Sequence, residues 1–323
     1  MKAVVCHEYG EPENLVLDEL PDLTPGPGQV VIRVRAAAVN YPDVLLIGGN
    51  YQVKVPPPFT PGSEMAGEVL AVGEDVDCRV GERVSAAAFV GAFAEQAVVD
   101  ARGVTPIPDG IDFAEAAAFG VTYRTAYYTL RTIAPVHTGD WVVVLGAAGG
   151  VGLAAVDIAQ LLGGRVLAAA SGQDKLDLCR ERGAEACIDY DREDLRERIK
   201  DITGNAGAHI VVDPVGGQYS LPALRGLGRH GVFVTLGYAG GAIPAVPLNL
   251  VLLKGITIRG MEIRTFAADH PDEVVRDDRE LQQLFAEDKL RPYIGARFPL
   301  SDTATALRHV ADRKALGKII IDV

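Results

Sequence analysis

The sequence predicts an α/β protein that combines a doubly wound parallel sheet with a separate β-rich domain. Three observations support this fold class. Short apolar runs lie between turn clusters in residues 1–118, strands and helices alternate after residue 119, and a glycine-rich segment joins one strand to one helix. The 323 residues are enough for about two domains with sizeable cores.

The first region, residues 1–118, is predicted to contain closely spaced strands. The turn clusters Pro25–Gly28 and Pro106–Gly110 interrupt its apolar runs, and proline and glycine at such intervals are typical of a small barrel or sandwich. The runs that we expect to be strands are Lys2–Cys6, Val30–Arg35, Ala66–Val72 and Gln96–Val99.

The second region, residues 119–260, alternates runs of strand length with segments of helical periodicity. Gly163 and Gly183 end two of the helical segments. This alternation predicts βαβ units and a parallel sheet. The expected strands are Trp141–Leu145, Arg165–Ala170, His209–Asp213 and Gly231–Leu236, and the expected helices are Val151–Leu162 and Asp174–Arg182.

The last region, residues 261–323, breaks this alternation. It contains a polar helix at Asp272–Asp288, a helix at Asp302–Lys314 that Ser301 caps, and a terminal strand at Lys318–Val323. We expect this segment to return to residues 1–118 and to complete one discontinuous domain.

Composition and charge exclude several classes of function. Hydrophobic residues make up 48% and charged residues 23% of the chain, as in folded globular proteins, and the net charge of −12 opposes binding to nucleic acid and anionic lipid. The four cysteines form no CxxC motif, the N-terminus lacks a signal-peptide core, and no apolar run approaches the roughly 20 residues of a membrane span. We expect a cytoplasmic protein with no nucleic-acid or membrane partner.

The segment Gly146–Gly152 carries the strongest functional signal. It follows an apolar strand and opens an apolar helix, which is the position of the pyrophosphate-binding turn in a Rossmann domain. Gly149 allows the backbone to approach a pyrophosphate, and Gly152 allows helix and strand to pack closely, although Ala147 replaces one glycine of the usual GxGxxG. The alternative is a tight turn without a cofactor. The residues that we expect to bind the cofactor are Ala148, Gly149, Gly150 and Val151.

The end of the second strand of this domain favours NADPH. NAD enzymes usually carry a carboxylate there, whereas this chain has small residues, the hydroxyl of Ser171 and the positive charge of Lys175. Asp174 is the residue that could instead accept from an unphosphorylated ribose, and Lys175 could be a solvated lysine on a helix face. Gly237 and Tyr238 follow another strand, at the sheet edge where ligands commonly bind.

The chain resembles the zinc-independent quinone oxidoreductase branch of the medium-chain dehydrogenase/reductase superfamily over essentially its whole length. The resemblance implies a GroES-like barrel, a Rossmann domain, a cleft between them and a homodimer. The matching segments are Asn40–Asp43, Gly48–Tyr51, Pro61–Glu68, Gly91–Glu95, Gly146–Gly152 and Gly317–Ile321.

The ligands of a catalytic zinc ion are not found in this sequence. Zinc-dependent relatives have a cysteine near Asn40–Asp43 and Gly-His-Glu where this chain has Gly62-Ser63-Glu64, and such a zinc needs three protein ligands. The cysteine-rich structural loop is also missing. Quinones and enones accept hydride into a delocalised system, so orientation and hydrogen-bond donors suffice without a metal. We expect an NADPH-dependent quinone reductase; the alternatives are an enoyl-thioester or enone C=C reductase and a non-catalytic NADPH-binding protein.

The resemblance also implies roles for individual residues. Tyr51 would donate a proton or only shape the cleft, and Asn40 would hydrogen-bond nicotinamide or substrate unless it is an ordinary turn asparagine. Thr122 would approach the cofactor or cap a helix, and Tyr190 would flank the 2′-phosphate or pack at a strand end.

Leu45, the segment Met261–Phe266 with Arg264, and Lys318 stay open. Some quinone reductases have a second tyrosine where this chain has Leu45, so substrate preference is expected to differ. Met261–Phe266 should border the nicotinamide. Within it, Arg264 would pair with an acidic substrate group or with a surface acid, and no role is assigned to Lys318.

Overall fold

The computed structural model describes residues 1–323, and the chain forms two compact units. One comprises Met1–Val121 and Arg291–Val323, and the other comprises Thr122–Leu290. The sequence placed the boundaries after residues 118 and 260, so residues 261–290 group differently from the expectation. None of the helices is both long and apolar enough to cross a membrane.

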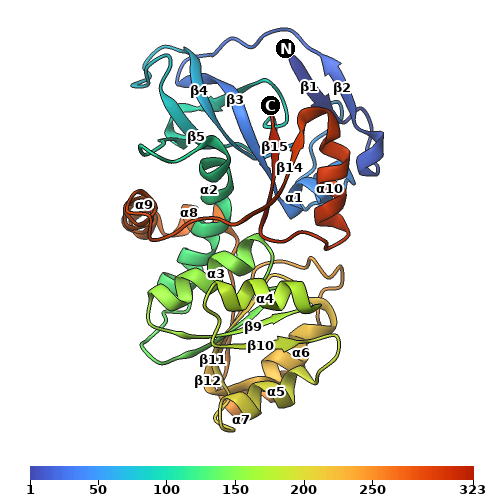
Figure 1. Cartoon of the computed structure of the whole chain (residues 1–323), viewed down its shortest axis with the longest axis vertical. Helices are drawn as coiled ribbons and strands as arrows, with labels where there is room; N and C mark the ends of the chain where they lie inside the picture. The colour runs from blue at the N-terminus through green and yellow to red at the C-terminus, as the bar shows by residue number, and fades with distance from the viewer. The chain divides into compact units, whose positions relative to one another are not determined.

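The first unit is built around a seven-stranded sheet with the order β14-β15-β3-β4-β5-β7, in which β6 also pairs with β3 (Figure 1). Only the β14–β15 pair is parallel. The strands are β3 (Gln29–Val39), β4 (Glu64–Val72), β5 (Arg83–Ala87), β6 (Gln96–Asp100), β7 (Val104–Pro106), β14 (Ile294–Pro299) and β15 (Lys318–Asp322), and a separate ribbon pairs β1 (Lys2–Val5) with β2 (Val16–Glu19).

The long strand β3 organises this unit because it pairs with three others. Its buried Ile32 and Val34 pack with Met65 of β4 and Ile319 of β15 in one apolar core. The C-terminal strand therefore shares a sheet with the N-terminal region. The unit's helices are α1 (Tyr41–Ile47), α10 (Thr303–Ala311) and the 3-10 turns Pro12–Asn14, Ala101–Gly103 and Leu300–Asp302.

The second unit contains a fully parallel six-stranded sheet with the order β10-β9-β8-β11-β12-β13. The order reverses between β8 and β11, which makes the carboxyl ends of these strands the switch point of a doubly wound sheet. The predicted fold class is confirmed. The strands are β8 (Trp141–Leu145), β9 (Arg165–Ala170), β10 (Ala186–Asp189), β11 (Ala208–Asp213), β12 (Leu227–Thr235) and β13 (Thr257–Gly260).

Helices cover both faces of this sheet. Figure 1 shows α3 and α4 on one face and α5 and α6 on the other. Val143 and Leu145 of β8 pack against Ile199 and Leu224 on the α5 and α6 side, in a core that is buried throughout. The helices are α3 (Gly150–Leu161), α4 (Gln173–Glu181), α5 (Leu195–Ile202), α6 (Gly217–Gly226) and α7 (Leu248–Lys254).

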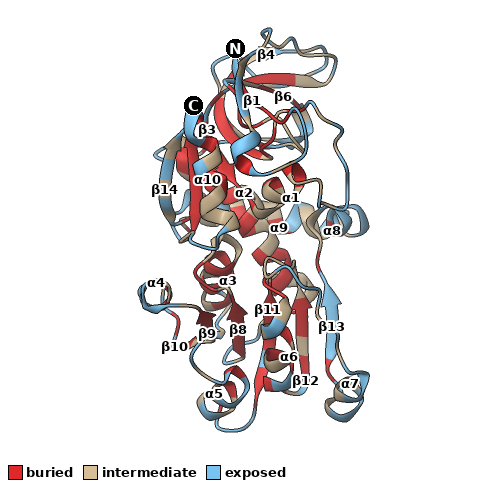
Figure 2. Ribbon diagram, turned by 90° about the vertical axis from the view of Figure 1, so that its right-hand side faces the viewer, coloured by how far each residue is buried: buried red, intermediate tan, exposed pale blue.

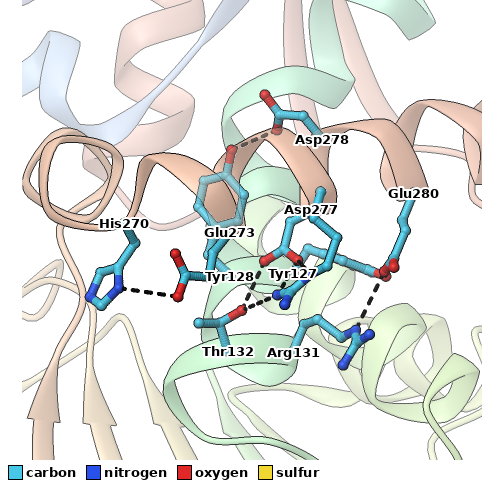
Figure 3. Close-up of polar contacts among 10 residues, drawn as sticks. Tyr127, Tyr128, Arg131, Thr132, His270, Glu273, Asp277, Asp278 and Glu280 are labelled. Carbon is cyan, nitrogen blue, oxygen red and sulfur yellow. Dashed lines mark hydrogen bonds and ion pairs between the residues drawn. The ribbon is translucent and has the colours of Figure 1, made fainter.

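Contacts between α2 and α9 explain why residues 261–290 belong to the second unit. The Tyr127 and Tyr128 hydroxyls donate to Glu280 and Asp278, both at 2.6 Å (Figure 3). Both tyrosines lie at the end of α2, and their partners lie on α9, which the sequence analysis grouped with the C-terminal region, residues 261–323. The elements are α2 (Phe113–Tyr128) with a π-helical turn at Thr129–Ile133, α8 (Ile263–Asp269) and α9 (Pro271–Ala286).

Candidate functional site

The glycine-rich turn joins β8 to α3 as the sequence predicts, and its geometry depends on glycine at two positions. Gly146 has a φ of +58°, which places it in the left-handed region. A Cβ at Gly152 would lie 2.2 Å from the Gly146 carbonyl oxygen, so no larger residue fits there without moving the turn. The Ala147 N–H donates to the Ala169 carbonyl of β9 at 3.1 Å and ties the turn to the neighbouring strand.

The N-terminus of α3 offers backbone donors to an anion. The first hydrogen bond within the helix runs from Leu153 N–H to the Gly149 carbonyl at 2.8 Å, and no side chain caps the helix. A Cβ at Gly149 would meet only the Gly146 oxygen, at 3.4 Å, so internal packing does not require glycine at this position. Space for a Cβ beside uncapped amides fits a pyrophosphate that approaches the backbone. Ala148 is buried, whereas Gly149, Gly150 and Val151 are partly accessible.

The residues expected at the adenosine 2′-phosphate gather at the ends of β9 and β10. The Tyr190 N–H donates to the Ala170 carbonyl at 3.3 Å, which places Tyr190 beside Ser171. Lys175, on the first turn of α4, has its Nζ 3.5 Å from the Ser171 Oγ. Asp174 is exposed. The structure thus brings the Ser171 hydroxyl and the Lys175 ammonium together and places Tyr190 on the adjacent strand end.

Gly237 and Tyr238 pack on the loop that follows β11. A Cβ at Gly216 would lie 2.8 Å from the Tyr238 Cδ1. The loop itself is fixed by Asp213, which sequence reasoning missed. Its Oδ1 accepts from the Val215 and Gly216 N–H groups at 2.9 and 2.8 Å, and burial raises the pKa of its carboxyl.

Thr122 is buried within α2, which begins at Phe113. The alternative that Thr122 caps a helix is wrong, because the helix starts nine residues earlier. The segment Met261–Phe266 is also placed by packing: the Phe266 ring stacks on Tyr128 with centroids 4.7 Å apart. Arg264 pairs with Glu262 at 3.0 Å, which is the surface ion pair that the sequence left as one alternative.

In the first unit, Asn40 lies in a buried polar cluster that we name the Lys318 cluster and that consists of Asn40, Asp43, Glu64 and Lys318. The Lys318 ammonium donates to Asn40 Oδ1 at 2.6 Å, to Glu64 Oε2 at 3.2 Å and to the Val39 carbonyl at 3.3 Å. These three bonds use all the donors of the ammonium. Lys318 is only 3% exposed and Glu64 2%, so both charges depend on this pairing.

The second oxygen of Glu64 is also occupied, because Oε1 accepts from the Val121 N–H at 2.6 Å. The Asn40 amide nitrogen donates to Glu64 Oε2 at 3.2 Å. Lys318 therefore holds the amide of Asn40 with its oxygen facing the ammonium. The amide nitrogen faces Glu64 and also lies 3.5 Å from both Ser63 Oγ and the Ala38 carbonyl oxygen.

Asp43 is the fourth member of the Lys318 cluster. Its Oδ2 accepts from the Asn40 N–H at 2.7 Å, while its Oδ1 is buried without a hydrogen-bond partner. Burial is the main cause that raises the pKa of this carboxyl to about 7, although the Asn40 N–H and the nearby Lys318 charge oppose the shift. Glu64 and Lys318 were not singled out as partners by the sequence, whose only signal was the glutamate in Gly62-Ser63-Glu64.

Tyr51 lies on the loop after α1. Its N–H donates to the Leu45 carbonyl at 3.2 Å, and its ring centroid is 6.2 Å from that of Phe89. Both rings are partly accessible. Phe89 was not identified from the sequence, because nothing in its spacing connects it to a tyrosine 38 residues earlier.

Comparison with known proteins identifies the family. Residues 26–109 match the family described as alcohol dehydrogenase GroES-like domain, and residues 150–276 match that described as zinc-binding dehydrogenase. The whole chain is 35% identical to quinone oxidoreductase-like protein 2 of Bos taurus and covers 92% of it. The chain belongs to the quinone oxidoreductase branch of the medium-chain dehydrogenase/reductase superfamily. The resemblance found in the sequence is confirmed, and the first unit is the GroES-like domain.

Two further relatives of this oxidoreductase align along their full length. It is 33% identical to the quinone oxidoreductase of Pseudomonas aeruginosa, with 99% of both chains covered. Escherichia coli quinone oxidoreductase, whose crystal structure was determined in complex with NADPH, superimposes with a TM-score of 0.93 at 28% identity, and the match covers 100% of both chains.

One family description names zinc, but the side chains of this oxidoreductase do not fit a zinc ion. The resemblance implies a cysteine near Asn40–Asp43 and a histidine at the position of Ser63 in zinc-dependent relatives, whereas this chain has neither there, and asparagine and serine are not usual zinc ligands. The Lys318 ammonium already lies 3.2 Å from Glu64, where a second cation would be repelled. No group of three or more His, Cys, Asp or Glu side chains is placed to hold a metal ion.

Proposed function

We propose that this protein reduces quinones with NADPH and uses no zinc. It is an NADPH-dependent oxidoreductase of the medium-chain superfamily, and the quinone and the metal-free mechanism are the specific parts of the proposal. The observation that carries them is the Lys318 cluster, in which an ammonium pairs with Asn40 and Glu64, residues of the two segments that the resemblance links to zinc ligands in zinc-dependent relatives. Alcohol dehydrogenation in this fold relies on a metal to stabilise an alkoxide, whereas the hydroquinone anion is far less basic and needs less stabilisation.

In this proposal the second unit binds NADPH along the carboxyl ends of its strands. The amides of Gly150 and Val151, with the backbone of Ala148 and Gly149, receive the pyrophosphate at the uncapped start of α3, while the Gly149 N–H itself donates to the Gly146 carbonyl. Ser171, Lys175 and Tyr190 surround the 2′-phosphate, since a hydroxyl and an ammonium are suitable donors to its oxygens. The positions proposed to complete the cofactor site are Thr122, Gly237 and Tyr238.

NADPH supplies a hydride from C4 of its nicotinamide. The first unit supplies hydrogen-bond donors that orient the quinone and stabilise the hydroquinone anion formed when the quinone accepts the hydride. Asn40 contributes its amide nitrogen, one hydrogen of which is shared between the ligand and the long contacts to Ser63 and Ala38, while Lys318 holds the amide oxygen. Tyr51 presents a phenol that hydrogen-bonds a quinone oxygen. The overall change consumes NADPH, a quinone and one proton and yields NADP⁺ and the hydroquinone.

A C=C reductase acting on enones or enoyl thioesters is the second candidate, and Tyr51 favours it because a phenol on an accessible loop can protonate an enolate carbon. Tyr51→Phe separates the two. The variant should lower kcat for an enone by at least about tenfold and kcat for a quinone by a clearly smaller factor, since a hydroquinone anion takes its proton from water and loses only one hydrogen bond. Equal rates of both reactions in variant and parent would remove Tyr51 from the chemistry.

We also propose that the protein is a cytoplasmic homodimer that pairs through β13. This strand has one unpaired edge and all four of its residues are exposed (Figure 2). Leu252 on α7 is 82% exposed and Ile258 on β13 is 40% exposed. An unpaired strand beside exposed leucines favours pairing with a second copy. Sedimentation should give a dimer for the parent and a monomer for Ile258→Lys, and a monomeric parent would contradict the proposal.

The central experiment measures NADPH oxidation at its nicotinamide absorbance with a panel of quinones, enones and enoyl-CoA thioesters. Quinones should give the highest kcat/KM, and treatment with a chelator should leave the rate unchanged. A rate that disappears with the chelator and returns with zinc would overturn the metal-free mechanism. NADPH binding without turnover on any acceptor would favour a non-catalytic binding protein.

A further inference from the structure

Tyr190 does not stand alone at the phosphate corner, because a second tyrosine from a distant segment covers its ring. Tyr219, on the first turn of α6, stacks on Tyr190 with ring centroids 4.0 Å apart and an interplanar angle of 28°. Its hydroxyl donates to the carboxylate of Asp191, the residue that follows Tyr190. The ring and the hydroxyl of Tyr219 thus contact two consecutive residues at the end of β10.

Both members of the stack are attached to rigid parts of the second unit. The backbone of Tyr190 bonds to β9 through the Ala170 carbonyl, directly before Ser171. Tyr219 is adjacent to Ser220, whose hydroxyl donates to the buried Asp213 Oδ2 at 2.5 Å. The position of Tyr219 is therefore set by the loop after β11, and that of Tyr190 by β9 and β10.

We propose that Tyr219 is a positioning residue that sets the preference for the 2′-phosphate by holding the ring plane of Tyr190. This inference rests on the proposed NADPH site. A phenol on a strand end rotates about χ1 and χ2, and stacking against a fixed ring removes that freedom before the ligand binds. Tyr219 acts only through Tyr190 in this proposal. Its side chain needs no contact with the cofactor.

The test uses two probes that differ only by the phosphate, adenosine 2′,5′-bisphosphate and adenosine 5′-monophosphate. Dissociation constants of both are measured by calorimetry for the full-length protein and for Tyr219→Phe, Tyr219→Leu and Tyr219→Met. Phenylalanine keeps the stack, whereas leucine and methionine fill similar volume without an aromatic plane. Tyr293→Leu, on the other unit, is the control for removal of a partly exposed tyrosine.

The preference for the 2′-phosphate is the dissociation constant of the monophosphate divided by that of the bisphosphate. Tyr219→Leu and Tyr219→Met should lower it by roughly three- to tenfold, while Tyr219→Phe and Tyr293→Leu should keep it within about twofold. In a Tyr190→Leu background, Tyr219→Leu should change the ratio by less than about twofold, because its effect passes through Tyr190. A purely packing role would weaken both probes equally and leave the ratio unchanged.

Two results overturn the inference. The first is an unchanged ratio of dissociation constants in Tyr219→Leu or Tyr219→Met, measured in whichever of these variants folds. The other is an effect of Tyr219→Leu that persists in full without Tyr190. Failure of the NADPH site itself gives a different result: the parent protein would bind the bisphosphate no more tightly than the monophosphate. That outcome rejects the cofactor assignment together with the role of Tyr219.

Discussion

Replacing Asp43 by asparagine tests whether the Lys318 cluster holds a carboxyl that resists ionisation. The pKa of Asp43 rises from 3.8 to about 7 in the folded chain, with burial as the main cause. Between these values the folded protein retains a proton that the unfolded chain has lost, so raising the pH favours unfolding. One pKa unit corresponds to about 1.4 kcal/mol, so this single carboxyl removes about 4 kcal/mol of stability as the pH rises from about 4 to about 7.

Asparagine at position 43 cannot titrate, so the variant does not lose this part of its stability as the pH rises. The unfolding free energy of Asp43→Asn minus that of the parent should increase by roughly 2 kcal/mol between about pH 5 and pH 7, and should level off above about pH 8. Urea unfolding followed by far-UV circular dichroism at several pH values measures this difference. The control is Asp109→Asn, an exposed residue of the same unit. A difference that stays constant across the pH range for Asp43→Asn would refute the argument that burial controls this carboxyl.

Two other predictions concern the second unit. Arg182→Met should destabilise it by about 3–5 kcal/mol in chemical denaturation, because Asp157, whose Oδ1 lies 3.1 Å from the Arg182 Nε, would remain buried without its cation; a loss below about 1 kcal/mol would contradict this. Lys175→Ala should raise the dissociation constant of NADPH by about tenfold and that of NADH by less than about twofold in fluorescence titrations. An equal loss for both cofactors would mean that Lys175 does not contact the 2′-phosphate.

The sequence was sufficient for features that depend on neighbouring residues. The strand at Trp141–Leu145 and the helix after Gly149 follow from local periodicity, and the structure places both within two residues of the prediction. A strongly apolar segment can be identified as a strand or a helix from its own pattern of residues, without knowledge of its tertiary contacts. The glycine at position 152 is equally local, since its close contact is with the turn that directly precedes it.

The Lys318 cluster could not be predicted in the same way, because strand register assembles it. Pairing of β3 with β4 places Ala38 opposite Glu64, and pairing of β15 with β3 places Val39 opposite Ile319. A shift of one residue in either pair would turn Lys318 or Glu64 to the other face of the sheet. Register across such separations depends on packing of the whole unit. The α2 tyrosines bond to acidic residues of α9 through helix packing between segments far apart in the sequence, which local periodicity does not predict either.

The charges of this cluster also explain why a metal-free mechanism suits the fold. Glu64 and Lys318 neutralise each other, and Asp43 remains neutral when it keeps its proton, so the buried group carries little net charge. A divalent cation added beside the ammonium would leave a buried excess of positive charge, which is costly in a medium of low polarity. The lysine therefore makes the site electrostatically unfavourable for zinc. In the proposed function, the reaction yields an anion that hydrogen-bond donors alone can stabilise, and a hydroquinone meets that condition better than an alkoxide.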